Sequence, residues 1–390
     1  MSDQTTSMLD RIKAVLPQIA ARAAQAEEDR MVPRENIELL KSTGLHRAFQ
    51  PRIYGGLEMP VPEFENCVAA IAGACGSTAW AFSLLAQHSH QLAIYSKQLQ
   101  DELWAENPDA VASSSIAPYG KAEETEGGIV FSGEFGWSSG CEHADWAILG
   151  FLRDTPEGGK AYSFAVLPRS DYTIRDTWFA KGMRGTGSKT IVVDRAFVPS
   201  HRIESVPDLM GMKSAGAHLY PDSRTYFTPF IYVFASCFAA VSLGLAERMI
   251  EIYREKTQAR VRAYTGAKVG ATIPAAMRLA ESAHQVAAGR AFLEKTWEDM
   301  RVHAWNREYP TAEKMAYWRT NQAYAVKMFI EAVDRLFAAS GGTAWFDSSE
   351  AQRLFRDAHM TGAHAYTDYD ICAQILGRAL MGLEPDPSLF

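Results

Sequence analysis

Apolar residues recur at helical spacing through roughly the first hundred positions of the chain. Leu9, Ile12 and Leu16 fall on one helix face, and an alanine- and leucine-rich stretch follows over residues 68–95. A break occurs at Pro51, where a proline and the glycines after it interrupt the helical period. The pattern predicts an N-terminal helical domain over residues 1–110.

The pattern changes after residue 110. Short runs of alternating or β-branched residues, separated by Gly, Pro, Asp and Ser, cover 128–137, 146–151, 162–167 and 189–198. The helical period returns in long segments over 234–262, 274–306 and 310–339. We therefore expect a β domain over 111–225, which ends in a long irregular loop, and a C-terminal helical domain over 226–390.

Composition narrows the class of protein. The 390 residues are 47% hydrophobic and 22% charged, which is typical of a globular chain. The net charge is -7 and no basic block occurs, so we expect no nucleic-acid partner. Charges interrupt every apolar patch near the N-terminus, and no run of about 18 apolar residues occurs, so we expect a cytoplasmic protein without a membrane segment. The five scattered cysteines favour neither a disulfide framework nor a thiolate metal site.

Several common motifs are incomplete or absent. The segment from Gly182 to Thr190 resembles the phosphate-binding loop of a nucleoside triphosphatase, in which a glycine directly precedes the lysine and a helix follows. In this chain Ser188 separates Gly187 from Lys189, and a strand follows, so we do not expect that function. No G-x-G-x-x-G follows an early strand, which argues against the usual dinucleotide-binding fold. No G-x-S-x-G occurs, which weakens the case for a serine hydrolase. The histidine pairs at 88/90 and 359/364 lack the spacing of a metal site, so we predict no metal.

The order of helices and strands, together with short segments spread along nearly the whole chain, resembles the acyl-CoA dehydrogenase superfamily. The segments are Phe135-Gly-Trp-Ser-Ser-Gly-Cys-Glu-His-Ala-Asp-Trp146, Lys181-Gly-Met-Arg-Gly-Thr-Gly-Ser188 and Phe197-Val-Pro199. Within the superfamily, the oxygenase components of two-component flavin monooxygenases are most similar, on the segments Cys75-Gly-Ser-Thr-Ala-Trp80, Ser113-Ser-Ser115, Trp137-Ser-Ser-Gly-Cys141 and Arg356-Asp-Ala-His359. The resemblance implies a mainly α protein with a central β-barrel or sandwich domain and a C-terminal four-helix bundle.

The same resemblance implies an aromatic hydroxylase. A separate reductase would supply reduced FMN or FAD, and the flavin would react with O₂ to give a C4a-hydroperoxide. That species would transfer oxygen to a phenolic substrate, ortho to its hydroxyl, with a 4-hydroxyphenylacetate-like acid favoured. Because a phenol has a pKa of about 10, the site needs a base or a hydrogen-bond acceptor, and imidazole suits that task at neutral pH.

The resemblance gives roles to four candidate catalytic residues. His88 would contact the phenol and Ser114 would help to hold the same oxygen. Ser139 would lie near flavin N5, and His364 would line the pocket. His88 and Ser139 also have ordinary structural explanations, because buried histidines are usually structural and a serine at the end of a strand is usually a turn residue.

Binding roles follow in the same way. Tyr366 and Arg224 are the candidates for a substrate carboxylate, although an exposed loop arginine is usually only solvated. The flavin candidates are Trp137, Ser138, Ser139, Arg184, Thr186, Ser188, Arg262, Ser340, Gly341 and Gly342. The last four match stretches that reach a neighbouring subunit's flavin in the superfamily, which implies a homotetramer. A glycine pair after a long helix is also an ordinary helix stop, and Trp137 also suits a β-domain core.

Three other functions stay open. An acyl-CoA dehydrogenase needs a carboxylate base beside the flavin, and the comparable stretch from His364 to Tyr369 offers only Asp368, at an uncertain register. A monooxygenase acting on sulfur or nitrogen would use the same cofactor. A flavin-free scaffold would carry apolar residues at the candidate positions, which are polar in this chain.

Overall fold

The computed structural model describes residues 6–155 and 158–383, and helices fill the first part of this chain. Their bounds are α1 (Met8–Ala21), α2 (Ala23–Asp29), α3 (Arg34–Ser42), α4 (Val61–Ala74), α5 (Gly76–Leu92) and α6 (Lys97–Trp104). Every residue of α5 is buried. Because α5 contacts protein on all sides, its sequence carries both apolar and polar residues without a solvent face.

In the described residues, seven strands form a mixed sheet in the order β5-β6-β2-β1-β3-β4-β7. Their bounds are β1 (Ala112–Thr125), β2 (Gly128–Ser138), β3 (Trp146–Asp154), β4 (Lys160–Pro168), β5 (Thr173–Arg175), β6 (Lys189–Pro199) and β7 (Ile203–Ser205). Strands β1 and β3 run parallel, whereas β2 and β6 run antiparallel. The β2–β6 register shifts between Phe135 and Ser138, and Trp137 in this bulge has a φ of 66°, which side-chain-bearing residues rarely adopt.

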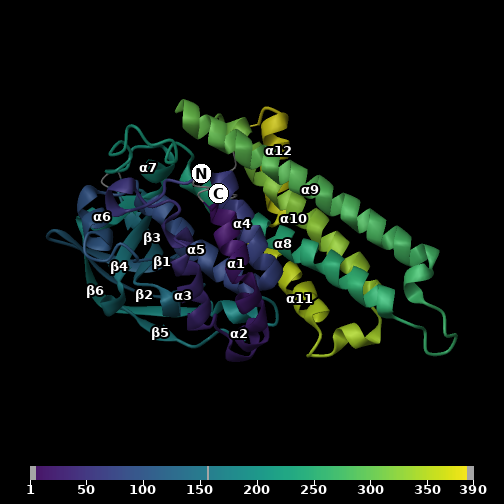
Figure 1. Cartoon of the computed structure of the whole chain (residues 1–390). Coiled ribbons are helices and arrows are strands. Elements are labelled where there is room, and N and C mark those ends of the chain that lie inside the picture. Colours follow the sequence, from purple (N-terminus) through teal and green to yellow (C-terminus); the bar gives the residue numbers. More distant parts are fainter. Residues whose placement is uncertain (1–5, 156–157, 384–390) are drawn as a thin grey trace, which may run out of the picture.

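Long helices return after the sheet. Their bounds are α7 (Val206–Met210), α8 (Phe230–Ala259), α9 (Ile273–Asn306), α10 (Ala312–Ala339), α11 (Glu350–Gly362) and α12 (Tyr369–Leu380). Figure 1 shows α8, α9 and α10 side by side, with α1, α4 and α5 between them and the sheet. Helix α8 approaches α4 closely at Gly244, where a Cβ would lie 2.1 Å from the main-chain oxygen of Ala69. The predicted fold class, mainly α with a central β region, is confirmed.

Helix α8 is long and apolar enough to cross a membrane when length and composition alone are considered. In this fold it is a central helix, and 89% of its most apolar 18-residue window is buried inside the protein. Packing against α4 and α10 therefore accounts for its apolar composition.

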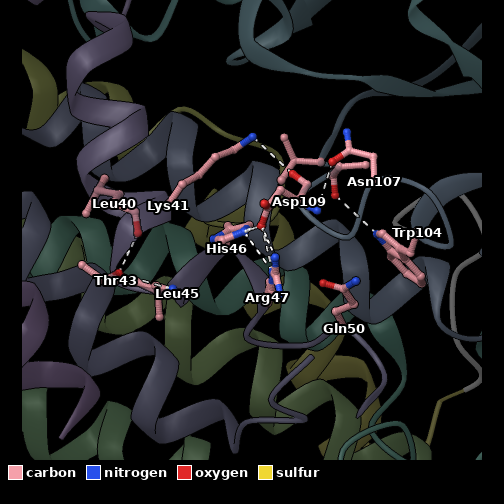
Figure 2. A network of polar contacts seen from close by, with 12 residues as sticks. Leu40, Lys41, Thr43, Leu45, His46, Arg47, Gln50, Trp104, Asn107 and Asp109 are labelled. Carbon is pink, nitrogen blue, oxygen red and sulfur yellow. Dashed lines mark hydrogen bonds and ion pairs between the residues drawn. The ribbon is translucent and has the colours of Figure 1, made fainter. Parts of the chain in front are cut away.

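A polar network joins the N-terminal helices to the start of β1 (Figure 2). The side chains of His46 and Arg47 converge on the carboxylate of Asp109, at 2.5 Å from His46 Nε2 and 2.8 Å from Arg47 Nε. Two residues later, the main-chain N–H of Val111 donates to the carboxylate of Asp145 at 3.0 Å. The start of β1 is therefore fixed from two sides, and the first residues of this strand are those that reach the candidate site.

Candidate functional site

A cavity of about 330 Å³ lies where α5, α8, the loop after α11 and strands of the sheet meet. Aromatic side chains form much of its wall, and the described ones are Trp80, Tyr119, Trp137, Trp178, Phe234 and Phe238. Its polar side chains are Ser114, Ser115, Ser139, Thr186, Ser188 and His364. The structure therefore brings together, around one space, candidates that are far apart in the sequence.

Three hydroxyl groups form a continuous hydrogen-bonded row on one side of the cavity. Ser139 follows β2, Thr186 ends the short 3₁₀ helix η5 (Arg184–Thr186), and Ser188 precedes β6. The Ser139 and Ser188 oxygens are 2.7 Å apart, and those of Ser188 and Thr186 are 2.6 Å apart. At the two ends, Trp80 Nε1 donates to Ser139 Oγ at 3.2 Å, and Thr186 Oγ1 donates to the main-chain oxygen of Met183 at 2.8 Å. We call Ser139, Thr186 and Ser188 the hydroxyl wall.

His88 lies on α5, behind the cavity lining. Its Nδ1 is 2.8 Å from the main-chain oxygen of Ala112, so Nδ1 carries the proton and donates it. Nε2 is therefore an acceptor, and it is buried without a hydrogen-bond partner in the described part of the chain. Burial lowers the pKa of His88 to about 4, which keeps the ring neutral at neutral pH. The ring lies beside Phe234, which lines the cavity, with 5.9 Å between ring centroids.

His364 presents the opposite polarity. The main-chain N–H of Tyr366 donates to His364 Nδ1 at 3.3 Å, so the neutral ring carries its proton on Nε2. Burial, and secondarily the nearby charge of Arg319, lower the pKa of His364 to about 4. The ring packs on Phe238 at 4.1 Å between centroids. We call His88 and His364 the imidazole end, because one offers an acceptor nitrogen and the other an N–H donor.

Of three further candidates from the β region, Ser114 and Trp137 line the cavity and Ser138 does not. Ser114 lies on β1, is half-buried and pairs with Ile148 of β3. Trp137 lies at the mouth, with 66% of its surface exposed and its ring 5.1 Å from that of Trp178. Ser138 is fully buried and donates to Ser113 Oγ at 3.1 Å, so its side chain is directed away from the cavity.

The two candidate arginines do not line the cavity. Arg184 Nε donates to the main-chain oxygen of Glu27 at 3.0 Å, which ties η5 to α2. Arg224 is exposed, and it donates to the main-chain oxygen of Trp305 at 3.2 Å. Both side chains are thus engaged with backbone elsewhere in the fold.

Tyr366 lies next to the imidazole end rather than in the lining itself. Its ring meets that of Phe234 edge-on, with centroids 5.5 Å apart, and stacks near His364 at 5.7 Å. The guanidinium of Arg319 lies 4.9 Å from the centre of the Tyr366 ring. Burial raises the pKa of Tyr366 to about 12, so its hydroxyl stays protonated at neutral pH.

The four candidates for a neighbouring subunit's flavin lie away from the cavity. They are Arg262, Ser340, Gly341 and Gly342, in the loop after α8 and at the end of α10. A hydrogen bond from Arg260 to the main-chain oxygen of Ala339, at 3.1 Å, holds these two segments together. None of the four contributes to the described lining of the cavity.

Of the aromatic residues that line the site, sequence reasoning named Trp137 alone. Phe234 and Phe238 stand four residues apart on α8, a spacing that also describes ordinary core packing. Trp80 belongs to a segment that carried the family resemblance, but no role followed from it. Its indole N–H bond to Ser139 depends on a contact between residues 59 positions apart, which the sequence pattern does not reveal.

A dehydrogenase base is missing from the site. Asp368 accepts hydrogen bonds from the main-chain N–H groups of Asp370 and Ile371, at 3.0 and 3.4 Å, and so caps α12. No aspartate or glutamate lines the cavity in the part of the chain that the structure describes. Proton removal beside a thioester therefore has no carboxylate here.

The cavity instead suits a planar heterocycle with polar edges. Indole and phenyl rings provide apolar faces, and the hydroxyl wall provides hydrogen-bonding atoms along one edge. The isoalloxazine ring of a flavin has this chemistry, so the described residues fit a flavin. Within residues 6–155 and 158–383, no group of three or more His, Cys, Asp or Glu side chains is placed to hold a metal ion.

Comparisons with known proteins show the family of this chain. Residues 236–369 match the family model described as acyl-CoA dehydrogenase, C-terminal domain. The chain is 64% identical, over 98% of its length and 91% of the relative's, to the oxygenase component of p-hydroxyphenylacetate 3-hydroxylase from Acinetobacter baumannii. It is 31% identical, over 97% and 95%, to the oxygenase component of an FADH(2)-dependent resorcinol hydroxylase from Rhizobium sp..

A solved structure extends the likeness to the whole fold. The crystal structure of a 3-HSA hydroxylase from Rhodococcus sp. RHA1 superposes with a TM-score of 0.93 and 32% identity, and covers 100% of both chains. The chain therefore belongs to the oxygenase components of two-component flavin-dependent monooxygenases, enzymes of the acyl-CoA dehydrogenase superfamily that use reduced flavin and O₂.

Proposed function

We propose that this enzyme hydroxylates a simple phenolic acid resembling 4-hydroxyphenylacetate, at the carbon ortho to the phenol hydroxyl. The observation that carries the proposal is the buried, unpartnered Nε2 of His88 beside the cavity. A buried acceptor without a partner costs free energy, and a phenol O–H is a donor that would satisfy it. Relatives named as hydroxylases of p-hydroxyphenylacetate and resorcinol support the same class of substrate.

His88 would act first as a hydrogen-bond acceptor. With its pKa lowered to about 4, the imidazole is too weak a base to remove the proton from a resting phenol of pKa about 10. A hydrogen bond to Nε2 nevertheless raises the electron density on the phenol ring. As the ring gives electrons to the incoming oxygen, its hydroxyl becomes acidic, and the proton moves to Nε2.

The hydroxyl wall would hold the cofactor. Reduced flavin supplies the electrons that activate O₂. Ser139 would bond the N5 edge of the isoalloxazine ring, and the packed rings of Trp80 and Phe238, with centroids 4.5 Å apart, would exclude water from that edge. Ser114, which lines the same cavity from β1, would help to hold the phenol oxygen.

The region around Tyr366 supports an acid as the substrate. Its hydroxyl stays protonated, and the guanidinium of Arg319 lies over its ring, so this side of the imidazole end combines a donor with a positive charge. A carboxylate needs that combination. Arg224 is bonded to Trp305 and would not contribute.

A separate flavin reductase would supply the cofactor, as in the two-component family. We also propose assembly into a homotetramer. Exposed apolar side chains lie near the segments that would reach another copy's flavin, namely Val261, Tyr264, Ile273, Trp345 and Phe346. The five cysteines are buried and unpaired, which suits a reducing cytoplasm.

Product analysis tests this proposal. Anaerobically reduced FMN and the enzyme are mixed with O₂ and 4-hydroxyphenylacetate, and we expect 3,4-dihydroxyphenylacetate in amounts close to the O₂ consumed. Benzoate, which lacks the phenol donor, is the control and should give only H₂O₂. Formation of H₂O₂ alone from 4-hydroxyphenylacetate, or desaturation of an acyl-CoA, would overturn the proposed function.

A further inference from the structure

The hydroxyl wall has a fixed direction. An indole N–H can only donate, so the bond from Trp80 leaves Ser139 Oγ as its acceptor. A main-chain carbonyl can only accept, so Thr186 must donate to Met183. Between these two ends each hydroxyl has one proton to give. Ser139 therefore donates to Ser188, and Ser188 donates to Thr186.

The accepting end of the row is held rigidly. The main-chain N–H of Met183 donates to Asp357 Oδ1 of α11 at 2.6 Å. The carbonyl of Met183 accepts from Trp178 Nε1 at 3.2 Å as well as from Thr186. Because both the N–H and the carbonyl of Met183 are hydrogen-bonded, its peptide groups are held in place. The carbonyl therefore stays the acceptor for Thr186, and the direction of donation along the hydroxyl wall is fixed. Asp357 and Met183 are 2–3% exposed, so water does not compete for these groups.

This direction decides what Ser139 can offer to a ligand. Its proton is committed to Ser188, so toward the cavity it presents a lone pair and no donor. Reduced flavin carries a hydrogen on N5 and can donate to that lone pair. Oxidised flavin has a bare N5, and two acceptors facing each other repel and lose a hydrogen bond.

We propose that Ser188, acting through Ser139, makes this site selective for reduced over oxidised flavin. Ser188 is a positioning residue that holds the Ser139 proton out of the cavity. The inference rests on the proposed placement of the flavin N5 edge at Ser139. Such selectivity suits an enzyme whose cofactor arrives reduced and must leave once oxidised, because the spent flavin is released rather than retained.

Equilibrium binding tests the inference without turnover. In Ser188→Ala the Ser139 proton is free to rotate into the cavity and donate to the bare N5. The ratio of the dissociation constants for oxidised and reduced FMN should therefore fall about tenfold, as expected for one net hydrogen bond. Flavin fluorescence measures the oxidised form, and anaerobic titration measures the reduced form.

Two more variants keep the test decisive. Thr186→Val removes the acceptor for Ser188 and should lower the ratio in the same direction, which serves if Ser188→Ala does not fold. Ser83→Ala is the matched control, because Ser83 is a buried serine on α5 whose hydroxyl donates to the main-chain oxygen of Trp80 on the same helix and bonds no member of the hydroxyl wall. Its ratio should equal that of the wild type.

The outcomes separate the two claims. Wild-type enzyme that binds neither form of flavin would overturn the proposed function. Wild-type enzyme that prefers reduced flavin, with the same ratio in Ser188→Ala and Thr186→Val, would overturn the role of the row and leave the proposed function intact. A fall in the Ser83→Ala ratio equal to that in Ser188→Ala would show a general effect of losing buried hydroxyls and would also overturn it.

Discussion

The hydroxyl wall and the imidazole end lie at the same cavity, which His364 lines and His88 approaches from behind Phe234, but they differ in how their hydrogen bonds are satisfied. In the wall, each hydroxyl proton is already given to another protein atom. At the imidazole end, Nε2 of His88 is buried and has no hydrogen-bond partner among the residues that the structure describes. Because every proton of the hydroxyl wall is already donated, the wall can only accept a hydrogen bond from a bound molecule. Nε2 of His88 is a free acceptor and can bond a donor on the substrate. The first suits a cofactor of fixed protonation, and the second suits a substrate that must lose a proton.

A second histidine on α5 shows that an unpartnered nitrogen alone does not make a site. Within residues 6–155 and 158–383, Nδ1 of His90 is also buried without a partner, and its Nε2 bonds the main-chain oxygen of Thr225 at 3.1 Å. It packs against Phe49 and Tyr226, which do not line the cavity. His88 therefore differs from His90 in lying beside the cavity. Substituting each histidine in turn tests whether this difference in position decides which one acts in the reaction.

The largest expected effect is that of His88→Asn. Asparagine has no basic nitrogen at the position of Nε2, so the rate of phenol hydroxylation should fall about 10²- to 10⁴-fold, because a positioned acid–base group contributes that much. Oxygen consumption by the reduced-flavin complex should change by no more than about threefold, because the hydroxyl wall is untouched. Rapid-quench product analysis and an oxygen electrode measure the two rates.

His90→Asn is the matched control for that substitution. It removes a buried imidazole from the same helix, two residues further on, and should leave hydroxylation within about threefold of wild type wherever a thermal melt shows the variant folded. Equal losses in the two variants would assign His88 a structural role only.

The next effect concerns acid stability. Burial lowers the pKa of His90 to about 4, whereas an unfolded histidine titrates near 6.5. Between those values the unfolded chain binds more protons, so the free energy of unfolding falls as the pH falls from about 6.5 to 4. One such histidine contributes up to about 3 kcal/mol over this window.

His90→Asn should therefore lose less stability than wild type between pH 7 and pH 4.5, as measured by urea unfolding at both values. An identical loss in the two proteins would show that His90 does not titrate in this way. The same sign applies to His88 and His364, whose pKa values are also lowered to about 4.

Ser139→Ala should have a smaller effect, on the other side of the cavity. Without the acceptor at N5, the fraction of O₂ that ends in product should fall about tenfold, with H₂O₂ making up the difference. Affinity for the phenol should stay within about twofold, because the imidazole end is unchanged. A peroxidase-coupled assay measures H₂O₂. Loss of phenol affinity with unchanged coupling would reverse the roles of the two sides.

The smallest expected effect concerns the substrate carboxylate. Tyr366→Phe should weaken binding of 4-hydroxyphenylacetate about fivefold and leave binding of p-cresol, which has no carboxylate, unchanged. Arg224→Ala should affect neither, because that side chain bonds Trp305. Equilibrium dialysis of 4-hydroxyphenylacetate and p-cresol measures both affinities in each variant. Weaker binding of 4-hydroxyphenylacetate to Arg224→Ala would show that Arg224, after all, contacts the carboxylate.

The sequence predicts the architecture well because the helical and strand periods are long and distinct. The change of pattern after residue 110 precedes β1, which begins at Ala112, and the helical period returns with α8 at Phe230. The family resemblance gives Ser139, Ser188 and His364 as candidates, and all three line one cavity.

The sequence could not predict the direction in which individual side chains point, or which residues from distant parts of the chain come into contact. Ser138 and Ser139 are adjacent serines whose side chains point in opposite directions, as in any extended strand, with Ser138 toward Ser113 and Ser139 toward the cavity. The register shift in β2 just before them hides from the sequence which of the two faces the cavity. Arg224 lies in a loop whose path only the fold determines. The direction of the hydroxyl row depends on Trp80 and Met183, which come from separate parts of the chain.

An anaerobic crystal structure with reduced flavin and 4-hydroxyphenylacetate tests the division between the two sides most directly. We predict the phenol oxygen at about 3 Å from His88 Nε2 and the flavin N5 at about 3 Å from Ser139 Oγ. A phenol bound away from His88, or a flavin whose N5 edge faces away from Ser139, would contradict the account.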